Sequence, residues 1–221
     1  LRDVYKRHGL GFTGLGDALL MLCSKYDTEE ARMLAAEIAE FMRDVAYEAS
    51  IELAKEKGAF EIFEAEGYLQ SPFIQRLPEN LKNRILESGI RNSHLLSIAP
   101  TGTISLAFAD NASNGIEPPF SWWYPRNKRE SDGSTKQYKV MDHAYRVWLA
   151  RGGSEENLPE YFVTALSISA GSHMAMLEAV QPFIDTSISK TVNVPEDYPF
   201  DEFKSLYMDC LLYTSLSGLA R

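Results

Sequence analysis

Apolar residues recur at helical spacing over one long stretch near the start of the chain. They follow Asp27 and Glu30, whose three-residue separation is typical of a capping box at the start of a helix. The apolar positions are Ala31, Leu34, Ala35, Ile38, Met42, Val45, Ala49 and Leu53. This periodicity predicts a helix that runs to about Lys57, stops at Gly58 and is about 45 Å long.

Shorter patterns predict further helices and a polar loop. Four glycines between 9 and 16 precede an apolar run at 18–22, which indicates a tight turn leading into a closely packed helix. Helices are also predicted over 79–88, 141–150 and 173–184, the last ended by Pro182, and another begins near Pro199. The stretches 122–126 and 135–140 bracket a polar loop with the turn signal Asp132–Gly133.

Two stretches are predicted to be short strands, the mostly apolar Ser93–Ala99 and the alternating Ser187–Val194. Each is ended by a proline, Pro100 and Pro195 respectively. Strands and helices therefore alternate along the chain without an internal repeat, which favours an α/β fold with parallel crossovers. Ligand sites in such folds gather at the carboxyl ends of strands. We therefore expect the two strands to be near neighbours whose hydroxyl-bearing ends face one cleft.

Composition narrows the class of protein. Of the 221 residues, 45% are hydrophobic and 24% charged, which is typical of one globular domain or a piece of a larger one. The net charge of −9 argues against a nucleic-acid or membrane-surface partner, and no apolar run is long enough to span a bilayer. The charged opening without an initiator Met indicates a cytoplasmic fragment or processed chain, which we treat as one domain over 1–221.

Neither the cysteines nor the histidines have the spacing of a metal or redox site. Cys23 and Cys210 are far apart in the sequence, and we expect both to be reduced and buried. The four histidines share no ligand spacing and are assigned structural or exposed positions: His8, His94, His143 and His173.

The segment PTGTIS, which follows the first predicted strand, carries the most specific chemistry. Pro100 ends the strand, Gly102 permits an unusual backbone conformation, and Thr103 can cap a short helix that begins near Ile104. A helix N-terminus exposes unpaired amides and holds phosphate well. The hydroxyls of Thr101, Thr103 and Ser105 add donors, but no Walker-type Gly-Lys-Ser/Thr follows. The alternative is an ordinary turn from strand to helix.

Two further segments have both a functional and a structural interpretation. Glu117 in GIEPP stands at a rigid corner, where its carboxylate either faces a ligand or caps a turn. The KTVN stretch (190–193) either faces a ligand or is a solvated strand end. A small basic patch of Arg126, Lys128 and Arg129 is expected to be solvated.

Four segments in order resemble one family: GLGFTGLGDALLML, RNSHLLSIAPTGTISLAFADNASNGIEPPF, LPEYFVTA and DTSISKTVNVPEDYPF. They resemble the C-terminal part of the catalytic subunit of ribonucleotide reductase, from about Gly9 to about Tyr207. In their detailed residues, the segments are most similar to the adenosylcobalamin-dependent (class II) ribonucleoside-diphosphate reductases. The resemblance implies that the chain is a portion of a ten-stranded α/β barrel.

The resemblance also implies a function and a site. The family reduces ribonucleoside diphosphates to 2′-deoxyribonucleoside diphosphates by a thiyl-radical mechanism, using adenosylcobalamin and a dithiol reductant such as thioredoxin. Its phosphate loop corresponds here to Thr101, Gly102, Thr103, Ile104 and Ser105, with Pro100 and Glu117 as cleft-shaping residues. The full-length parent is expected to form a homodimer.

The chain departs from the family in what it lacks. The radical and redox cysteines and the finger-loop Asn and Glu are expected upstream of Leu1, and Cys23 and Cys210 match none of them. The end, CLLYTSLSGLAR, also leaves the family pattern. We therefore expect no catalytic residue in the chain and no reductase activity from it alone. The alternatives are a fragment of the metal-radical (class I) large subunit, which shares the phosphate loop, and a non-catalytic phosphate-binding or nucleotide-binding module.

Overall fold

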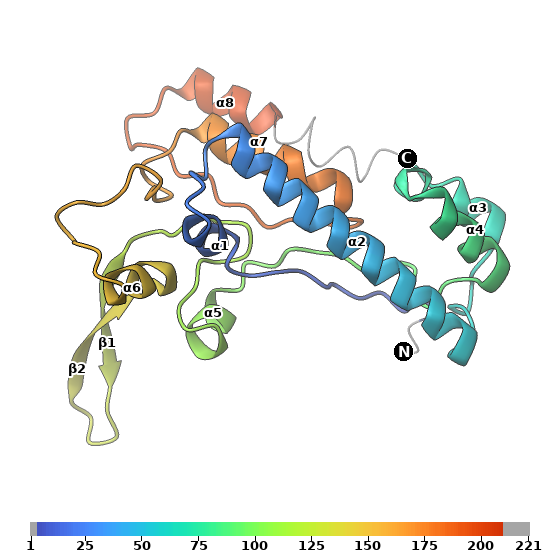
Figure 1. Ribbon diagram of the computed structural model, residues 1–221, viewed down its shortest axis with the longest axis horizontal. Helices are drawn as coiled ribbons and strands as arrows, with labels where there is room; N and C mark the ends of the chain where they lie inside the picture. Colours follow the sequence, from blue (N-terminus) through green and yellow to red (C-terminus); the bar gives the residue numbers. More distant parts are fainter. Residues whose placement is uncertain (1–3, 210–221) are drawn as a thin grey trace.

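The computed structural model describes residues 4–209 (Figure 1). Its elements are α1 (Leu15–Met21), α2 (Glu29–Lys57), α3 (Ala65–Leu69), η1 (Ile74–Arg76), α4 (Glu79–Ser88), α5 (Gly102–Phe108), β1 (Trp123–Arg129), β2 (Thr135–Met141), α6 (His143–Ala150), α7 (Ala170–Val180), η2 (Gln181–Phe183) and α8 (Phe200–Asp209). No helix in this part of the chain is both long and apolar enough to cross a membrane.

The long helix α2 confirms the periodicity argument. Its N-cap is Thr28, whose hydroxyl accepts the amide of Ala31 at 3.3 Å, and it ends at Gly58, where φ is 79°. One face is fully buried and contributes alanines, Tyr47 and Ile51 to the core. The helix runs alongside α7 and contacts α4 (Figure 1). It therefore covers one side of the extended segments that carry the candidate site.

Three extended segments pair in parallel beneath α2. Leu10 pairs with Leu96, and Ile98 pairs with Ile188. The amide of Ser97 donates to Leu10 O at 2.8 Å, and the amide of Ser189 donates to Ile98 O at 2.8 Å. The prediction that the segments near 95 and 190 are neighbours is therefore confirmed. Only a few residues of the predicted strand 187–194 pair with the other segment, fewer than expected.

The expected barrel is not seen. Within residues 4–209 the only regular sheet is the antiparallel hairpin of β1 and β2, and the parallel pairing consists of two isolated bridges. Closing a barrel requires every strand to bond to a neighbour on both sides. The three parallel segments, 8–10, 94–98 and 186–189, cannot meet that requirement by themselves, so the fold here is a helical layer over a short parallel core.

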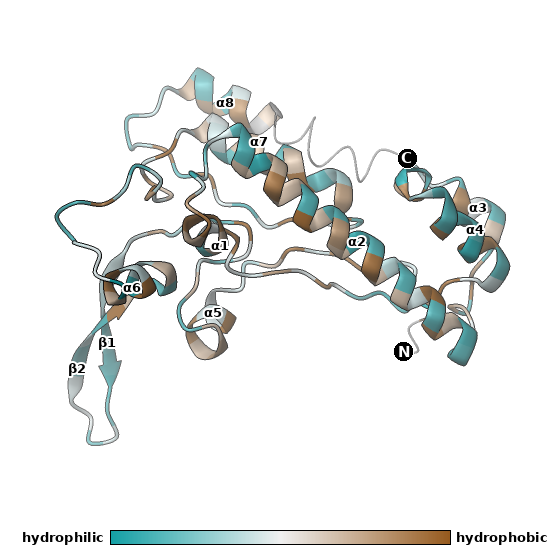
Figure 2. Ribbon diagram, in the orientation of Figure 1, coloured by the Kyte–Doolittle hydropathy of each residue, from teal (hydrophilic) through white to brown (hydrophobic). Residues whose placement is uncertain are grey.

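The hairpin lies at the periphery and is mostly exposed. Its register pairs Trp123 with Met141, and its turn contains Gly133, where φ is 86°. Figure 2 shows it hydrophilic over most of its length. The basic side chains of β1 at 126, 128 and 129 are exposed, as the sequence predicted for this patch.

Several predicted boundaries are wrong by a few residues. Met141 belongs to β2, so α6 begins only after Asp142, whose carboxylate caps it. The predicted helix 173–184 is α7 followed by the separate turn η2. Cys23 lies beyond the end of α1 with φ 57° and is exposed, so the expectation that it is buried in a helix is wrong. Cys210 lies outside the described residues.

Candidate functional site

The PTGTIS segment forms a turn that enters a helix, but two residues earlier than predicted. Thr101 is the N-cap of α5, and its φ of 53° lies in the left-handed region. The prediction that Gly102 takes the unusual conformation and that Thr103 caps the helix is therefore wrong. A left-handed threonine costs on the order of 1–2 kcal/mol, so the contacts of Thr101 must favour this conformation.

Hydrogen bonds to two other segments hold Thr101 in place. Its hydroxyl accepts the amide of Gly115 at 2.8 Å and bonds to the hydroxyl of Thr13 at 2.8 Å. The Thr13 hydroxyl in turn donates to Ser113 O at 3.1 Å. The Thr101 side chain therefore serves the protein rather than a ligand, and it joins the loop before α1 to the loop after α5.

Some of the other hydrogen-bond donors in PTGTIS bond within the protein, and others have no partner inside the helix. The Ser105 side chain is buried and its hydroxyl donates to Ala112 O, while its amide donates to Thr101 O at 2.8 Å. The amides of Gly102, Thr103 and Ile104 occupy the first turn of α5, where no intrahelical acceptor is within reach. Three consecutive amides are therefore available at this turn.

A cavity of about 440 Å³ lies against this turn. Gly102 and Thr103 line it, whereas Pro100, Ile104 and Ser105 do not. Glu117 also lines it, as do Thr191 and Asn193 of the KTVN stretch. Further polar lining residues that the sequence analysis did not identify are Asn111, Asn114, Ser121, Tyr124 and Asp142. Asn111 and Asn114 could have been suspected from the sequence, because both lie in the polar stretch ADNASNG.

Two buried carboxyl groups lie next to each other beside this cavity, and one of them, Asp142, lines it. Asp17 accepts the amide of Ser113 at 3.0 Å and that of Ala144 at 3.1 Å, while Asp142 accepts the amide of Tyr145 at 3.0 Å. Both aspartates are 3% exposed. Burial and the adjacent Asp17 raise the pKa of Asp142 to about 8, because two carboxylates so close together cannot both ionise easily. At neutral pH the pair therefore retains a proton.

We expect the protonated pair to make stability depend on pH. An unfolded aspartate titrates near pH 4, so between about pH 4 and pH 8 the folded chain holds a proton that the unfolded chain has lost. Stability therefore falls as pH rises through this window, by up to about 1.4 kcal/mol per unit. Asp142→Asn cannot ionise and remains a good N-cap, so its stability relative to wild type should increase from pH 5 to pH 8.

Urea denaturation at pH 5, 6.5 and 8 measures this difference. Asp197→Asn, at an exposed position, is the matched control and should track wild type at every pH. Stability curves of Asp142→Asn and wild type that stay parallel across the three pH values would contradict the shared proton.

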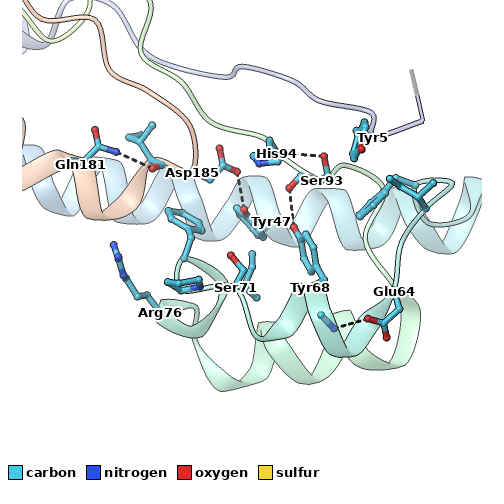
Figure 3. Close-up of a pocket in the computed structure, with 17 residues that line it drawn as sticks. Tyr5, Tyr47, Glu64, Tyr68, Ser71, Arg76, Ser93, His94, Gln181 and Asp185 are labelled. Atoms are coloured by element: carbon cyan, nitrogen blue, oxygen red, sulfur yellow. Dashed lines mark hydrogen bonds between the residues drawn. The ribbon is translucent and has the colours of Figure 1, made fainter. Parts of the chain in front are cut away.

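A second cavity, of about 490 Å³, lies at the amino ends of the parallel segments (Figure 3). Its lining joins aromatic side chains of the α2–α4 region to Ser93, His94 and Asp185. Tyr47 donates its hydroxyl to Asp185 at 2.8 Å, and Tyr68 donates to Ser93 O at 3.2 Å. Burial raises the pKa of Asp185 and of both tyrosines. Most polar groups here are thus satisfied within the protein, unlike the amides at the first cavity.

Within residues 4–209, no group of three or more His, Cys, Asp or Glu side chains is arranged to hold a metal ion. His173 lies in the core, where Nε2 donates to Ala165 O at 2.9 Å. The imidazole of His143 pairs with Asp110 at 2.9 Å on the surface.

Comparison with known proteins gives a consistent result. The family described as ribonucleotide reductase, barrel domain, matches residues 2–211. A vitamin B12-dependent ribonucleoside-diphosphate reductase of Mycobacterium tuberculosis is 31% identical over 92% of this chain and 29% of its own length. One from Thermoplasma acidophilum is 28% identical over 91% of this chain and 26% of its own length.

A ribonucleoside-diphosphate reductase large subunit of Danio rerio is also similar, at 28% identity over 86% of this chain and 28% of its own length. The chain thus spans less than a third of the length of these relatives. Because the family match extends over nearly all of the residues, the assignment rests on the whole sequence rather than on one motif. The chain belongs to the ribonucleotide reductase barrel domain family.

Proposed function

We propose that this chain is the part of a B12-dependent ribonucleoside-diphosphate reductase that binds the diphosphate of the substrate. The single observation that carries the proposal is the row of available amides at Gly102, Thr103 and Ile104 beside the cavity. Amides at a helix start bind phosphate oxygens without a positive side chain. The net charge of −9 makes such local donors necessary for an anionic ligand.

The other residues of the predicted loop support the site rather than contact the ligand. Thr101 and Ser105 hold the turn through their hydroxyl bonds, and Pro100 ends the preceding segment. Glu117 also lines the cavity. The diphosphate would lie in this cavity, with the ribose directed toward residues that this chain does not supply.

The cofactor and partners belong to the longer protein. The cavity at the phosphate turn is too small for a corrin ring with its nucleotide tail, and no histidine lines it to ligate cobalt. These residues therefore do not fit adenosylcobalamin, and we derive no step through it. By the same proposal the parent uses a dithiol reductant such as thioredoxin, acts in the cytoplasm and is a homodimer.

The Danio rerio relative supports a second candidate, a fragment of a class I large subunit, since it matches over most of this chain. Both candidates predict the same phosphate turn. We therefore expect this chain alone to bind a ribonucleoside diphosphate weakly and to reduce none. Reduction of a nucleotide by the purified chain with adenosylcobalamin and a dithiol would contradict this assignment.

Thr103→Asp tests the phosphate turn directly. A carboxylate in the first turn of a helix is compatible with folding because it interacts favourably with the helix dipole. It would, however, repel a diphosphate at the adjacent amides. We expect titration with cytidine diphosphate, followed by amide chemical shifts, to move Gly102 and Thr103 in wild type and to show at least about tenfold weaker binding in the variant.

Ser169→Asp is the matched control. Ser169 is the exposed N-cap of α7, where aspartate is an equally good cap, so this variant adds the same charge at a helix start outside the cavity. Its affinity for cytidine diphosphate should equal that of wild type. Equal weakening by both variants would mean that net charge alone governs binding, and unaltered binding by Thr103→Asp would refute the proposed turn.

A further inference from the structure

Three ionisable side chains from distant segments meet beside the phosphate cavity. Glu117 comes from the GIEPP corner, His173 from α7 and Lys190 from the end of the third parallel segment. The Lys190 ammonium donates to Glu117 Oε2, to His173 Nδ1 at 2.7 Å and to Thr191 O at 3.1 Å. All three donors of the ammonium group are therefore used.

The surroundings define the charge of each group. His173 Nε2 donates to Ala165 O, which leaves Nδ1 as the acceptor for Lys190. The imidazole is fully buried, and burial together with Lys190 lowers the pKa of His173 to about 4. Burial also lowers the pKa of Lys190, while Glu117 opposes this change. The cluster therefore consists of a neutral imidazole and the contact between Lys190 and Glu117.

Within the ion pair, the lysine side chain is almost inaccessible to solvent and the glutamate side chain is partly accessible. The side chains of Lys190 and Glu117 are 3% and 17% exposed. Glu117 Oε1 also accepts the amide of Thr191, so both carboxylate oxygens are bonded. The nearby Tyr26 donates its hydroxyl to Ile116 O at 2.7 Å. Burial is the larger cause that raises the pKa of Tyr26, and the charge of Glu117 is the smaller one.

Glu117 lines the same cavity as Gly102 and Thr103. A carboxylate at this place would repel a phosphate group unless its charge were neutralised. We propose that Lys190 is a positioning residue that neutralises Glu117 and binds it to the third parallel segment, so that the cavity can accept a diphosphate. This inference rests on the proposed function and deepens it. Lys190 does not itself contact the ligand.

The test is a double-mutant cycle with cytidine diphosphate, inorganic pyrophosphate and cytidine as probes. Lys190→Met leaves the Glu117 carboxylate beside the ligand without its cation, and we expect at least about tenfold weaker binding of both phosphate compounds and little change for cytidine. Lys190→Arg keeps the charge and should bind within about threefold of wild type. Equal binding of pyrophosphate by Lys190→Met and wild type would overturn the inference.

The second half of the cycle separates charge from mere structure. Lys190→Met combined with Glu117→Gln removes both charges and should bind pyrophosphate within about threefold of wild type. If the pair only held the fold together, the double variant would bind no better than Lys190→Met, and that result would also overturn the inference. Should Lys190→Met fail to fold, the double variant, which leaves no unpaired charge, carries the same comparison with wild type.

A readout without ligand distinguishes the two proposals. In wild type the His173 imidazole should stay neutral down to about pH 4 in a nuclear magnetic resonance titration. In Lys190→Met the cation is gone and Glu117 remains, so His173 should take up a proton at higher pH. Wild type that binds no diphosphate would refute the proposed function, whereas an unchanged His173 titration would refute the role of Lys190.

Discussion

Asp185→Ala is expected to lower the free energy of unfolding by about 4 kcal/mol, because it leaves three donors without an acceptor. The Asp185 carboxylate accepts the amides of Leu95 and Leu96, each at 2.8 Å, and the hydroxyl of Tyr47 at 2.8 Å. The buried Leu95 and Leu96 do not line the cavity beside Tyr47, so water cannot easily replace the lost acceptor of their amides. The carboxylate thus joins α2, the second parallel segment and the third.

Urea denaturation of Asp185→Ala and wild type measures the loss. Asp197→Ala is the control, since Asp197 is exposed, and it should change stability by less than about 0.5 kcal/mol. Asp185→Asn should fall between Asp185→Ala and wild type, because it keeps one acceptor oxygen and gains donors that face other donors. A loss below about 1 kcal/mol in Asp185→Ala would show that this carboxylate does not hold the segments together.

Gly16→Ala is expected to cost about 3 kcal/mol and to weaken diphosphate binding as well. A Cβ atom at this position would lie 2.7 Å from Glu117 O, 2.8 Å from Pro118 Cα and 2.9 Å from Pro119 Cδ. Backbone atoms and proline rings cannot rotate away, so α1 and the GIEPP corner must separate. That movement shifts Glu117, which lines the cavity, and we expect the affinity for cytidine diphosphate to fall together with stability.

The chain offers a closely matched control at Gly171. Both glycines occupy the second position of a helix, α1 and α7 respectively, but a Cβ atom at Gly171 would meet only Ser169 Oγ, at 3.8 Å. Gly171→Ala should therefore leave stability unchanged or raise it by up to about 1 kcal/mol. Thermal denaturation and titration with cytidine diphosphate compare the two variants. Similar behaviour of both would mean that helix propensity, not the close contact, governs the effect at Gly16.

Helices whose limits depend on local signals were predictable from the sequence. The capping signal near Asp27, the apolar repeat and Gly58 lie next to one another along the chain, and α2 begins within two residues of the prediction and ends where expected. The helix at 79–88 is likewise reproduced by α4. The start of α6 and the end of α7 were less predictable. Met141 pairs with Trp123 in the hairpin instead of starting α6, and Gln181 belongs to the separate turn η2 instead of α7.

The sequence by itself determined the helices with local caps, the order of the extended segments and the presence of a turn into a helix after Ala99. These follow from periodicity, proline positions and backbone preferences, which act over a few residues. Only the tertiary structure decided which donors at that turn remain available. Thr101 and Ser105 carry the same kind of hydroxyl as Thr103, yet partners such as Gly115 and Ala112 use them. The same reason applies to Glu117, since its carboxylate pairs with a lysine 73 positions away.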